Sequence, residues 1–368
     1  MRDSKDLASF TYYRGRVALH SILKALGVGR GDSVITQAFT CVAVPEAIMA
    51  TGAKPIYVDI EPYGFNMNYK DLEKKINGSI KAIIVQHTFG IPADMDPLEE
   101  LASKHDIPII EDCCHTLKST YKGQEVGNFG IASFYSYEWG KPVVVGIGGS
   151  ASINDEGLRD KVEESYNELK YPSLFMNIRI QLQYLGFLSF YRPNTYWNIR
   201  SIFRVLGKLG VAESNYNPIN ENSVSADFGM KMPRILEKRL MNKLKSLPQR
   251  TKNSKAISNK YRSKIEPICV KHPTLIQESD SIFVRYPLFA NNKDTLLGKA
   301  KRSGIELADW YTTPVHPLSD AELTLVNYEI GSCPNAENRC QEIVTLPTNK
   351  HVDDKFINTV VDFLNSQG

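Results

Sequence analysis

A lysine, a serine and several glycines occur in an order that suits one kind of covalent chemistry. Lys141 follows Ser136 by five residues, and Gly148 and Gly149 come shortly after it. A lysine amine can form a Schiff base, a serine hydroxyl can hold a phosphate, and glycines let backbone pass close to a bound ring. The segment is therefore a candidate for carrying a phosphorylated cofactor.

A second polar group lies upstream, where the apolar run 108–110 ends in Asp112, with His115 three residues later. A carboxylate at a strand end can pair with a pyridinium nitrogen and keep it protonated, so that the ring acts as an electron sink. Each residue alone also has an ordinary explanation, because lysines are mostly solvated and polar residues usually end strands. Only the combination indicates a site.

The surrounding elements must bring these residues together. We expect strands over 33–36, 54–60, 81–86 and 108–112, separated by helices over 17–26, 42–49 and 97–104. Strands that are apolar on both faces and alternate with helices predict a parallel sheet covered on both sides. Such sheets bind ligands at the carboxyl ends of their strands, where His87, the Asp112–His115 group and the segment leading to Lys141 fall.

The second half of the chain has a different pattern. Residues 228–265 are basic and helical with interruptions at Pro233 and Pro248. Strands over 281–290 and 343–346 then alternate with helices over 293–303 and 353–366. We predict a large α/β domain over 1–230 and a smaller α+β domain over 231–368.

Composition narrows the class of protein. The 368 residues carry a formal charge of +3, which gives no indication of nucleic-acid binding. The six cysteines lack metal-ligand spacing, so no metal site is expected. With no apolar signal segment or membrane span in the sequence, we expect a reduced, cytoplasmic compartment.

The combined motifs resemble the DegT/DnrJ/StrS sugar aminotransferase family of fold type I enzymes, which depend on pyridoxal 5′-phosphate (PLP). The order Asp112, His115, Ser136, Lys141 and the glycine pair carries the resemblance. Further matching segments are 15–20, 31–35, 38–40, 52–55, 87–90, 92–96 and 121–123. The resemblance covers most of the first 155 residues and implies the fold type I architecture.

The resemblance also implies roles. Lys141 would bind PLP and shuttle a proton, Asp112 would bind the pyridinium nitrogen, and His115 would lie near the ring hydroxyl. The residues that would hold the phosphate are Ser136, the turn at Gly15, the backbone N–H groups of Arg16 and Val17, and Lys231 from a neighbouring subunit. The residues that would face the substrate are Trp310, Tyr311 and His316.

The residues around Lys141 (Glu138 to Gly140 and Pro142) differ from the common family pattern, and so do three of the positions implied to bind the cofactor. Arg16 stands where a small hydroxyl residue is usual, so its guanidinium either adds a charge partner or turns to solvent. Cys41 stands where an aromatic ring commonly stacks on the cofactor, and Lys231 stands where asparagine is usual. The rings that could compensate for Cys41 are Phe89, Tyr137 and Trp139.

A basic, aromatic stretch lies between Glu168 and Glu213, with no acidic residue inside it. Three interpretations stay open: a surface for a diphosphate such as that of a nucleotide-sugar, a peripheral contact with an anionic membrane, or a helical excursion in a dimer interface.

The predicted function is transfer of an amino group, commonly from glutamate in this family, to a keto-sugar that is expected to be nucleotide-linked. The product would enter a surface polysaccharide or a secondary metabolite, and the enzyme would be a homodimer with shared sites.

One alternative is a PLP-dependent sugar dehydratase, although those relatives generally carry histidine at the position of Lys141. Another is a non-catalytic regulatory protein, for which Lys141 and Asp112 would have no use. A GxGxxG or Walker-type nucleotide-binding loop is absent from the sequence.

Overall fold

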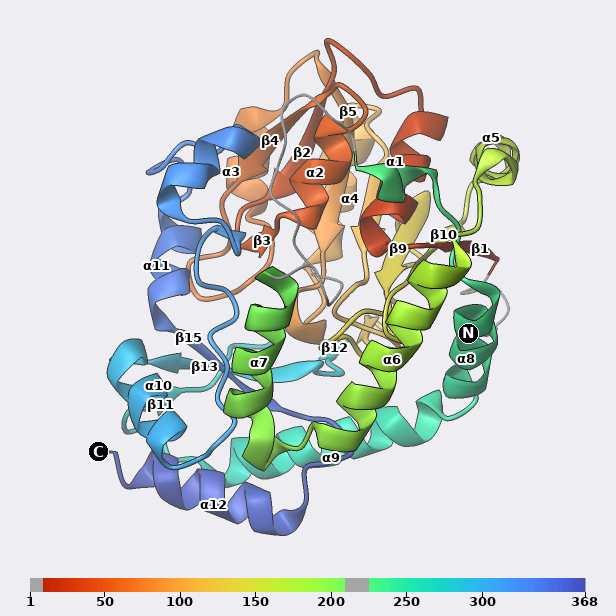
Figure 1. Cartoon of the computed structure of the whole chain (residues 1–368). Helices are drawn as coiled ribbons and strands as arrows, with labels where there is room; N and C mark the ends of the chain where they lie inside the picture. Colours follow the sequence, from red (N-terminus) through yellow and green to blue (C-terminus); the bar gives the residue numbers. More distant parts are fainter. Residues whose placement is uncertain (1–8, 209–224, 368) are drawn as a thin grey trace.

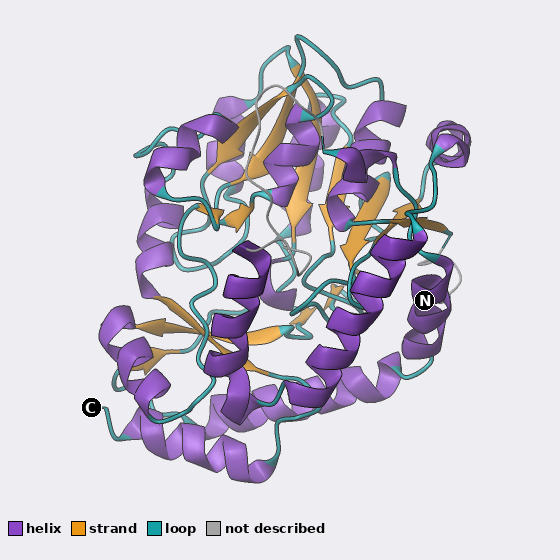
Figure 2. Ribbon diagram, in the orientation of Figure 1, coloured by secondary structure: helices purple, strands orange, loops and turns teal. Residues whose placement is uncertain are grey.

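A computed structural model describes residues 9–208 and 225–367. At its centre is a seven-stranded sheet in the order β1-β10-β9-β6-β5-β2-β4 (Figures 1 and 2). The strands are β1 (Phe10–Tyr12), β2 (Ser33–Gln37), β4 (Lys54–Val58), β5 (Ile80–Gln86), β6 (Ile109–Asp112), β9 (Ala132–Ser136) and β10 (Gly149–Ile153). From β4 to β9 all neighbours are parallel, whereas β10 and β1 run antiparallel to theirs. The predicted, mostly parallel sheet is confirmed.

Both faces of this sheet are buried under helices. Along β5, Ala82 and Ile84 face the core under helices α1 and α2, whereas Ile83 and Val85 face the core under α4. The helices are α1 (Gly15–Ala25), α2 (Ala43–Met49), α3 (Tyr69–Lys75), α4 (Met95–Lys104) and α5 (Glu156–Glu168). Because side chains alternate between the two faces, a continuously apolar strand is needed at the centre of such a sheet.

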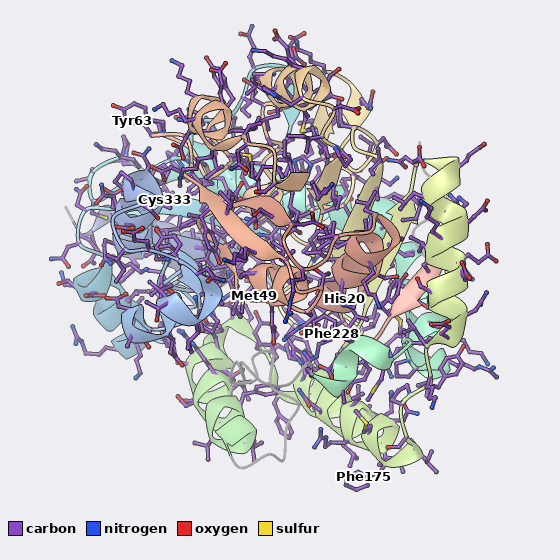
Figure 3. All side chains as sticks on the ribbon, turned by 90° about the horizontal axis from the view of Figure 1, so that it is seen from above. His20, Met49, Tyr63, Phe175, Phe228 and Cys333 are labelled. Atoms are coloured by element: carbon purple, nitrogen blue, oxygen red, sulfur yellow. The ribbon has the colours of Figure 1, made fainter. Side chains whose placement is uncertain are left out.

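The basic, aromatic stretch forms α6 (Leu174–Phe190), η3 (Pro193–Thr195) and α7 (Tyr196–Lys208), which lie across the front of the molecule in Figure 1. Glu213, the far limit of the stretch, lies outside the described residues. The inward face of α6 includes Tyr184, which is buried, and Phe187. The opposite face is aliphatic and exposed through Leu174, Ile178, Leu182 and Leu185, and Figure 3 shows Phe175 projecting outward from the same helix. Among the described helices, none has the length and apolarity to cross a bilayer.

The second half begins with α8 (Arg234–Leu244) and α9 (Leu247–Lys264), which start at the predicted interruptions near Pro233 and Pro248. A small antiparallel sheet follows, in the order β11-β13-β15 (Val270–Lys271, Arg285–Ala290, Ile343–Pro347). The helices around it are α10 (Lys293–Arg302), α11 (Pro334–Glu342) and α12 (Asp354–Asn365). The strand predicted over 281–290 begins only at Arg285, because β12 (Ser279–Asp280) instead pairs with β7 (Thr120–Tyr121).

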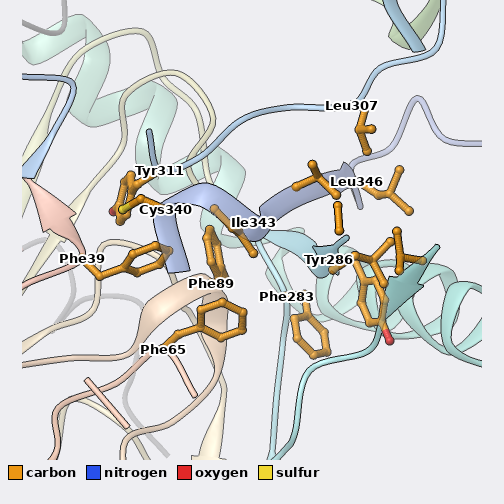
Figure 4. Close-up of a cluster of buried hydrophobic side chains, with 14 of the residues drawn as sticks. Phe39, Phe65, Phe89, Phe283, Tyr286, Leu307, Tyr311, Cys340, Ile343 and Leu346 are labelled. Carbon is orange, nitrogen blue, oxygen red and sulfur yellow. The ribbon is translucent and has the colours of Figure 1, made fainter. Parts of the chain in front are cut away.

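The two halves of the chain share packing. Phe39, Phe65 and Phe89 belong to one core with Tyr286 and Tyr311 (Figure 4). In addition, β3 (Thr40–Cys41) pairs with β14 (Val315–His316). The leucines of α8 pack with aromatic residues of the first half, in the core that contains Tyr13 and Tyr137.

Candidate active site

Lys141 lies in the loop between β9 and β10, which we call the Lys141 loop (137–148). Its backbone N–H donates to the carbonyl of Glu138, 3.3 Å away. The preceding residue, Gly140, has φ +77°, and a Cβ there would lie 2.6 Å from Cη2 of Trp310. Only glycine therefore allows the Trp310 ring to approach this turn. Nζ of Lys141 is 6.0 Å from the centre of that ring.

Cationic side chains from other elements hold the Lys141 loop. Nη1 of Arg14, at the start of α1, lies 3.0 Å from Oε2 of Glu138. From α8, Nη1 of Arg239 donates to the carbonyl of Val145 at 2.8 Å, and Nζ of Lys243 donates to the carbonyl of Val144. These contacts fix a segment that lacks regular secondary structure over most of its length.

Asp112 is the last residue of β6 and is buried, as expected for a strand end inside a covered sheet. Its Oδ1 accepts a hydrogen bond from the backbone N–H of Cys114 at 2.9 Å. Burial raises the pKa of Asp112, while the Cys114 N–H and the positive charge of Lys141 act in the opposite direction. The predicted carboxylate and the predicted amine thus lie within electrostatic reach of each other.

His115 is buried between two aromatic rings, Phe89 at 5.8 Å and Trp310 at 5.9 Å between ring centres, both nearly parallel to it. Its Nδ1 accepts a hydrogen bond from the backbone N–H of Phe89 at 3.2 Å. Burial, followed by the charges of Lys141 and His316, holds the pKa of His115 well below its usual range. A neutral imidazole that accepts at Nδ1 carries its proton on Nε2, which is 3.4 Å from the Tyr311 hydroxyl.

Ser136 ends β9 beside the first turn of α1. A Cβ on Gly15 would lie 3.1 Å from Cβ of Ser136, and a Cβ on Gly149 would lie 2.4 Å from the nitrogen of Gly15. These two glycines therefore let three backbone segments meet at the N-terminus of α1. No side-chain hydrogen bond caps that helix end, where the dipole favours an anion.

The arginines on either side of Gly15 are both buried. Arg16 is only 4% exposed and pairs with Glu46 of α2, so its guanidinium takes a charge partner and does not turn to solvent. Arg14 bonds Glu138 and, at 2.8 Å, Asp227 of η4 (Ala226–Gly229). Sequence reasoning missed the Arg14 pairs. The available signal was an arginine directly before Gly15 and a glutamate three residues before the lysine.

Cys41 pairs with His316 in the register of β3 and β14, which places it in the same region, and the charge of Lys141 acts on its thiol. Burial raises the pKa of Cys41, which keeps the thiol protonated. Of the rings expected to compensate for the missing stacking residue, Tyr137 bonds Ser150 and Trp139 packs on Phe187. Phe89 stacks on His115 instead.

The three predicted substrate-facing residues converge on this group. Trp310 and Tyr311 contact His115, and the ring centre of His316 is 5.1 Å from that of Tyr311. Nδ1 of His316 lies 3.0 Å from the hydroxyl of Thr312, and burial lowers the pKa of His316 to about 4. These residues from the second half of the chain thus form one wall beside Lys141.

Lys231 is the predicted residue that lies apart from this wall. Its Nζ is 4.4 Å from the ring centre of Tyr166 on α5, and its backbone N–H donates to the carbonyl of Lys170. Phe228, three residues before Lys231, packs against His20 of α1, and Figure 3 shows these two side chains side by side. The role expected of Lys231 concerns the phosphate of a second subunit and stays a prediction.

His87, Glu111 and Cys113 place their ligand atoms within 4.8 Å of one another. The Glu111 carboxylate accepts from His87 at 3.0 Å and from backbone N–H groups of residues 127, 129 and 130. The other ring nitrogen of His87 accepts from the N–H of Ala93. The His87 ring and the Glu111 carboxylate therefore already have hydrogen-bond partners within the protein.

Comparison with known proteins gives a consistent result. Residues 9–365 match the DegT/DnrJ/EryC1/StrS aminotransferase family. GDP-perosamine synthase from Escherichia coli O157:H7 is 42% identical over 151 residues, 41% of this chain, and the chain covers only 42% of that protein. A pleiotropic regulatory protein from Geobacillus stearothermophilus is 29% identical over 334 residues, which are 90% of this chain and 77% of that protein. The structure of DesV from S. venezuelae matches with a TM-score of 0.76 and 23% identity over 97% of this chain and 84% of that chain. The latter likeness concerns the fold alone.

Proposed function

Because the chain belongs to the DegT/DnrJ/EryC1/StrS aminotransferase family, we propose that it transfers an amino group from glutamate to a keto-sugar with PLP as its cofactor. The observation that carries the proposal is the convergence of Lys141, Asp112 and His115. These residues come from two separate segments, the end of β6 with the turn after it and the Lys141 loop, and the charge of Lys141 acts on both of the others. Perturbed groups that gather around one amine are typical of catalytic sites.

The residues fit the cofactor. Within the described residues, no cationic side chain bonds the Asp112 carboxylate, which leaves it suited to a protonated ring nitrogen. The uncapped N-terminus of α1 with Ser136 beside it suits a phosphate. Lys141 forms no ion pair with the described residues, so its amine is available for covalent chemistry. When bound, PLP supplies an aldehyde for the amine and a ring that withdraws electrons.

The residues then have distinct roles in this proposal. Asp112 would hold the ring nitrogen of the cofactor protonated. His115, kept neutral by burial, would orient the ring by donating from Nε2. Nζ of Lys141 would take a proton from the substrate carbon and deliver it to the carbon of the cofactor that bears the nitrogen, and the Trp310 ring would exclude water on that side.

The acceptor is proposed to be a nucleotide-linked keto-sugar, and the enzyme a homodimer in which Lys231 reaches the partner's phosphate site. The name of the Escherichia coli relative, GDP-perosamine synthase, supports a nucleotide-linked amino-sugar product.

A second candidate function is regulation without catalysis, which the Geobacillus stearothermophilus relative favours by its name. A sugar dehydratase is the third, and the lysine at position 141 speaks against it. Buried Asp112 facing an amine has no purpose in a pure binding protein, so the aminotransferase is the better supported function.

The test is the visible spectrum of the protein purified with PLP, before and after addition of glutamate. We expect an absorption band that glutamate bleaches in the wild type, and loss of the normal band in Lys141→Ala. Asp112→Asn should retain the band but bleach far more slowly, because the ring nitrogen is no longer kept protonated. No band in the wild type would reject catalysis and favour regulation, and a band that ignores glutamate would reject glutamate as donor.

A further inference from the structure

The outer face of α6 is apolar and exposed along most of the helix. Its residues recur at helical spacing and therefore lie on one side, and we call them the α6 apolar face: Leu174, Phe175, Ile178, Leu182 and Leu185. Phe175 is 74% exposed and Leu182 is 65% exposed. Figure 3 shows Phe175 at the outer edge of the molecule, at the opposite end of the view from Tyr63. A contiguous row of large apolar side chains in water marks an interaction surface.

The inner face of α6 is fixed to the body of the protein. Tyr184 is buried, and Phe187 packs on Trp139 with 4.7 Å between ring centres. Just beyond the helix, the hydroxyl of Tyr191 donates to Oε2 of Glu306 at 2.9 Å. Because these contacts hold α6 against the protein, its outer face meets a partner side-on, as a strip about 25 Å long for 17 residues.

A hollow of about 560 Å³ between α6 and α8 continues this surface. Its apolar walls are formed by both helices through Leu174, Ile178, Leu182 and Ile235. An exposed arginine, Arg234, lines the hollow as well, and its guanidinium carbon is 4.9 Å from the centre of the Tyr171 ring. An apolar groove beside a cation suits a ligand that has an apolar chain and an anionic head.

The charges around the α6 apolar face are positive. The sequence has no aspartate or glutamate from residue 169 to residue 208. Exposed Arg192 follows the C-terminal end of α6, and exposed Arg234 lies beside its N-terminal half. No carboxylate within residues 9–208 and 225–367 forms an ion pair with either arginine. A second copy of the same face would bring like charges together, whereas an anionic surface would neutralise them.

We propose that the α6 apolar face binds the surface of a membrane that contains anionic phospholipids. The helix lies in the plane of the headgroups, with Phe175 and Leu182 among the first acyl carbons. Arg192 and Arg234 pair with lipid phosphates, and the hollow between α6 and α8 takes part of an acyl chain. Membrane binding and the proposed amino transfer are independent, so either can fail without the other.

The experiment is co-sedimentation of the full chain, with PLP present, with vesicles of phosphatidylcholine mixed with phosphatidylglycerol and, separately, of phosphatidylcholine alone. We expect binding to the mixed vesicles that added NaCl weakens, and much weaker binding to phosphatidylcholine alone. Phe175→Ser and Leu182→Ser should each weaken binding about tenfold, because each removes an apolar side chain that the bilayer would bury. Arg192→Gln should weaken it about fivefold by removing one charge near the lipid phosphates.

Tyr63→Ser is the matched control, since Tyr63 is 80% exposed at the opposite end of the molecule and its replacement should leave vesicle binding unchanged. Unchanged thermal melting of the variants would show that they fold, and light scattering without vesicles reports their oligomeric state. The proposal is overturned if the wild type does not bind the mixed vesicles, or if the Phe175→Ser and Leu182→Ser double variant binds them like the control. A double variant that forms smaller assemblies than a wild type that ignores vesicles would assign the face to a second copy of the chain instead.

Discussion

Arg14 joins three segments that are far apart in the sequence. It precedes the first turn of α1, bonds Glu138 in the Lys141 loop and bonds Asp227 in η4, and its side chain is 1% exposed. A buried arginine is tolerated only when its charge and its donors are matched. Arg14 therefore positions the Lys141 loop relative to the first turn of α1, through Glu138 and not through Lys141 itself.

Replacing Glu138 with glutamine should lower the free energy of unfolding by about 3 kcal/mol, because it leaves a buried guanidinium short of one counter-charge. Denaturant unfolding of the PLP-free protein measures this effect. Asp354→Asn is the control, since it breaks an exposed pair with Lys260 and should change little. Equal effects of the two substitutions would show that Arg14 is adequately held by Asp227 alone.

The residues proposed to hold the cofactor are easier to find in the sequence than the residues that support them. Asp112, His115, Ser136 and Lys141 lie at or near strand ends and in short motifs, so local pattern is sufficient to nominate them. The support from Arg239 and Lys243 is invisible to such reasoning, because their backbone partners are 94 and 99 residues away. Every residue type has a backbone carbonyl, so the sequence cannot show which carbonyl accepts such a hydrogen bond.

At the scale of elements, α8 acts as a fastening for the Lys141 loop. Its leucines pack beside Tyr137 and Val145, and its cations bond the loop carbonyls on the same side. The sequence predicts a long basic helical segment here. It does not show which residues of that segment form the buried apolar face and which form the charged face. Apolar packing and hydrogen bonds from one helix thus act together on a loop that has little regular secondary structure.

The pH dependence of stability tests this fastening. The pKa of Lys243 is lowered to about 8 by burial and then by Arg250, Arg239 and Lys350, whereas the unfolded chain has the ordinary value near ~10.4. Between these values the unfolded chain binds more protons, so the contribution of Lys243 to the free energy of unfolding rises with pH and is smallest below pH 8. Urea midpoints from pH 7 to 10 should show a rise in the wild type that Lys243→Met loses.

Lys238→Met provides the control for that series, because Lys238 is exposed on the same helix. Its pH profile should run parallel to that of the wild type. If Lys243→Met also follows the wild type, then the ammonium is not withdrawn from water as the packing around Tyr184 indicates.

At the scale of the whole molecule, the two halves cannot be separated cleanly. Phe39, Phe65 and Phe89 pack with Tyr311 in a single core, and β3 pairs with β14 across the same junction. The boundary at 230 stays a prediction. The architecture could be predicted from the alternation of strands and helices, whereas the shared core could not, because it depends on contacts between residues hundreds of positions apart.

We therefore expect one cooperative unfolding transition. Calorimetry of the PLP-free chain should give a single peak with equal calorimetric and van't Hoff enthalpies. A fragment over 231–368 should remain unfolded by circular dichroism, since it would expose the apolar partners of Phe39 and Phe89. Two resolved peaks, or a folded fragment, would contradict this expectation.

The tryptophans have an unusual distribution. The sequence contains three, and Trp139 lies in the Lys141 loop, Trp310 packs against its Gly140, and Trp197 bonds the carbonyl of Ile305 near that wall. No tryptophan lies elsewhere in the chain to contribute a background signal. The intrinsic fluorescence of this protein is consequently an unlabelled optical probe of the region around Lys141, able to follow ligand arrival there in a stopped-flow instrument without any dye.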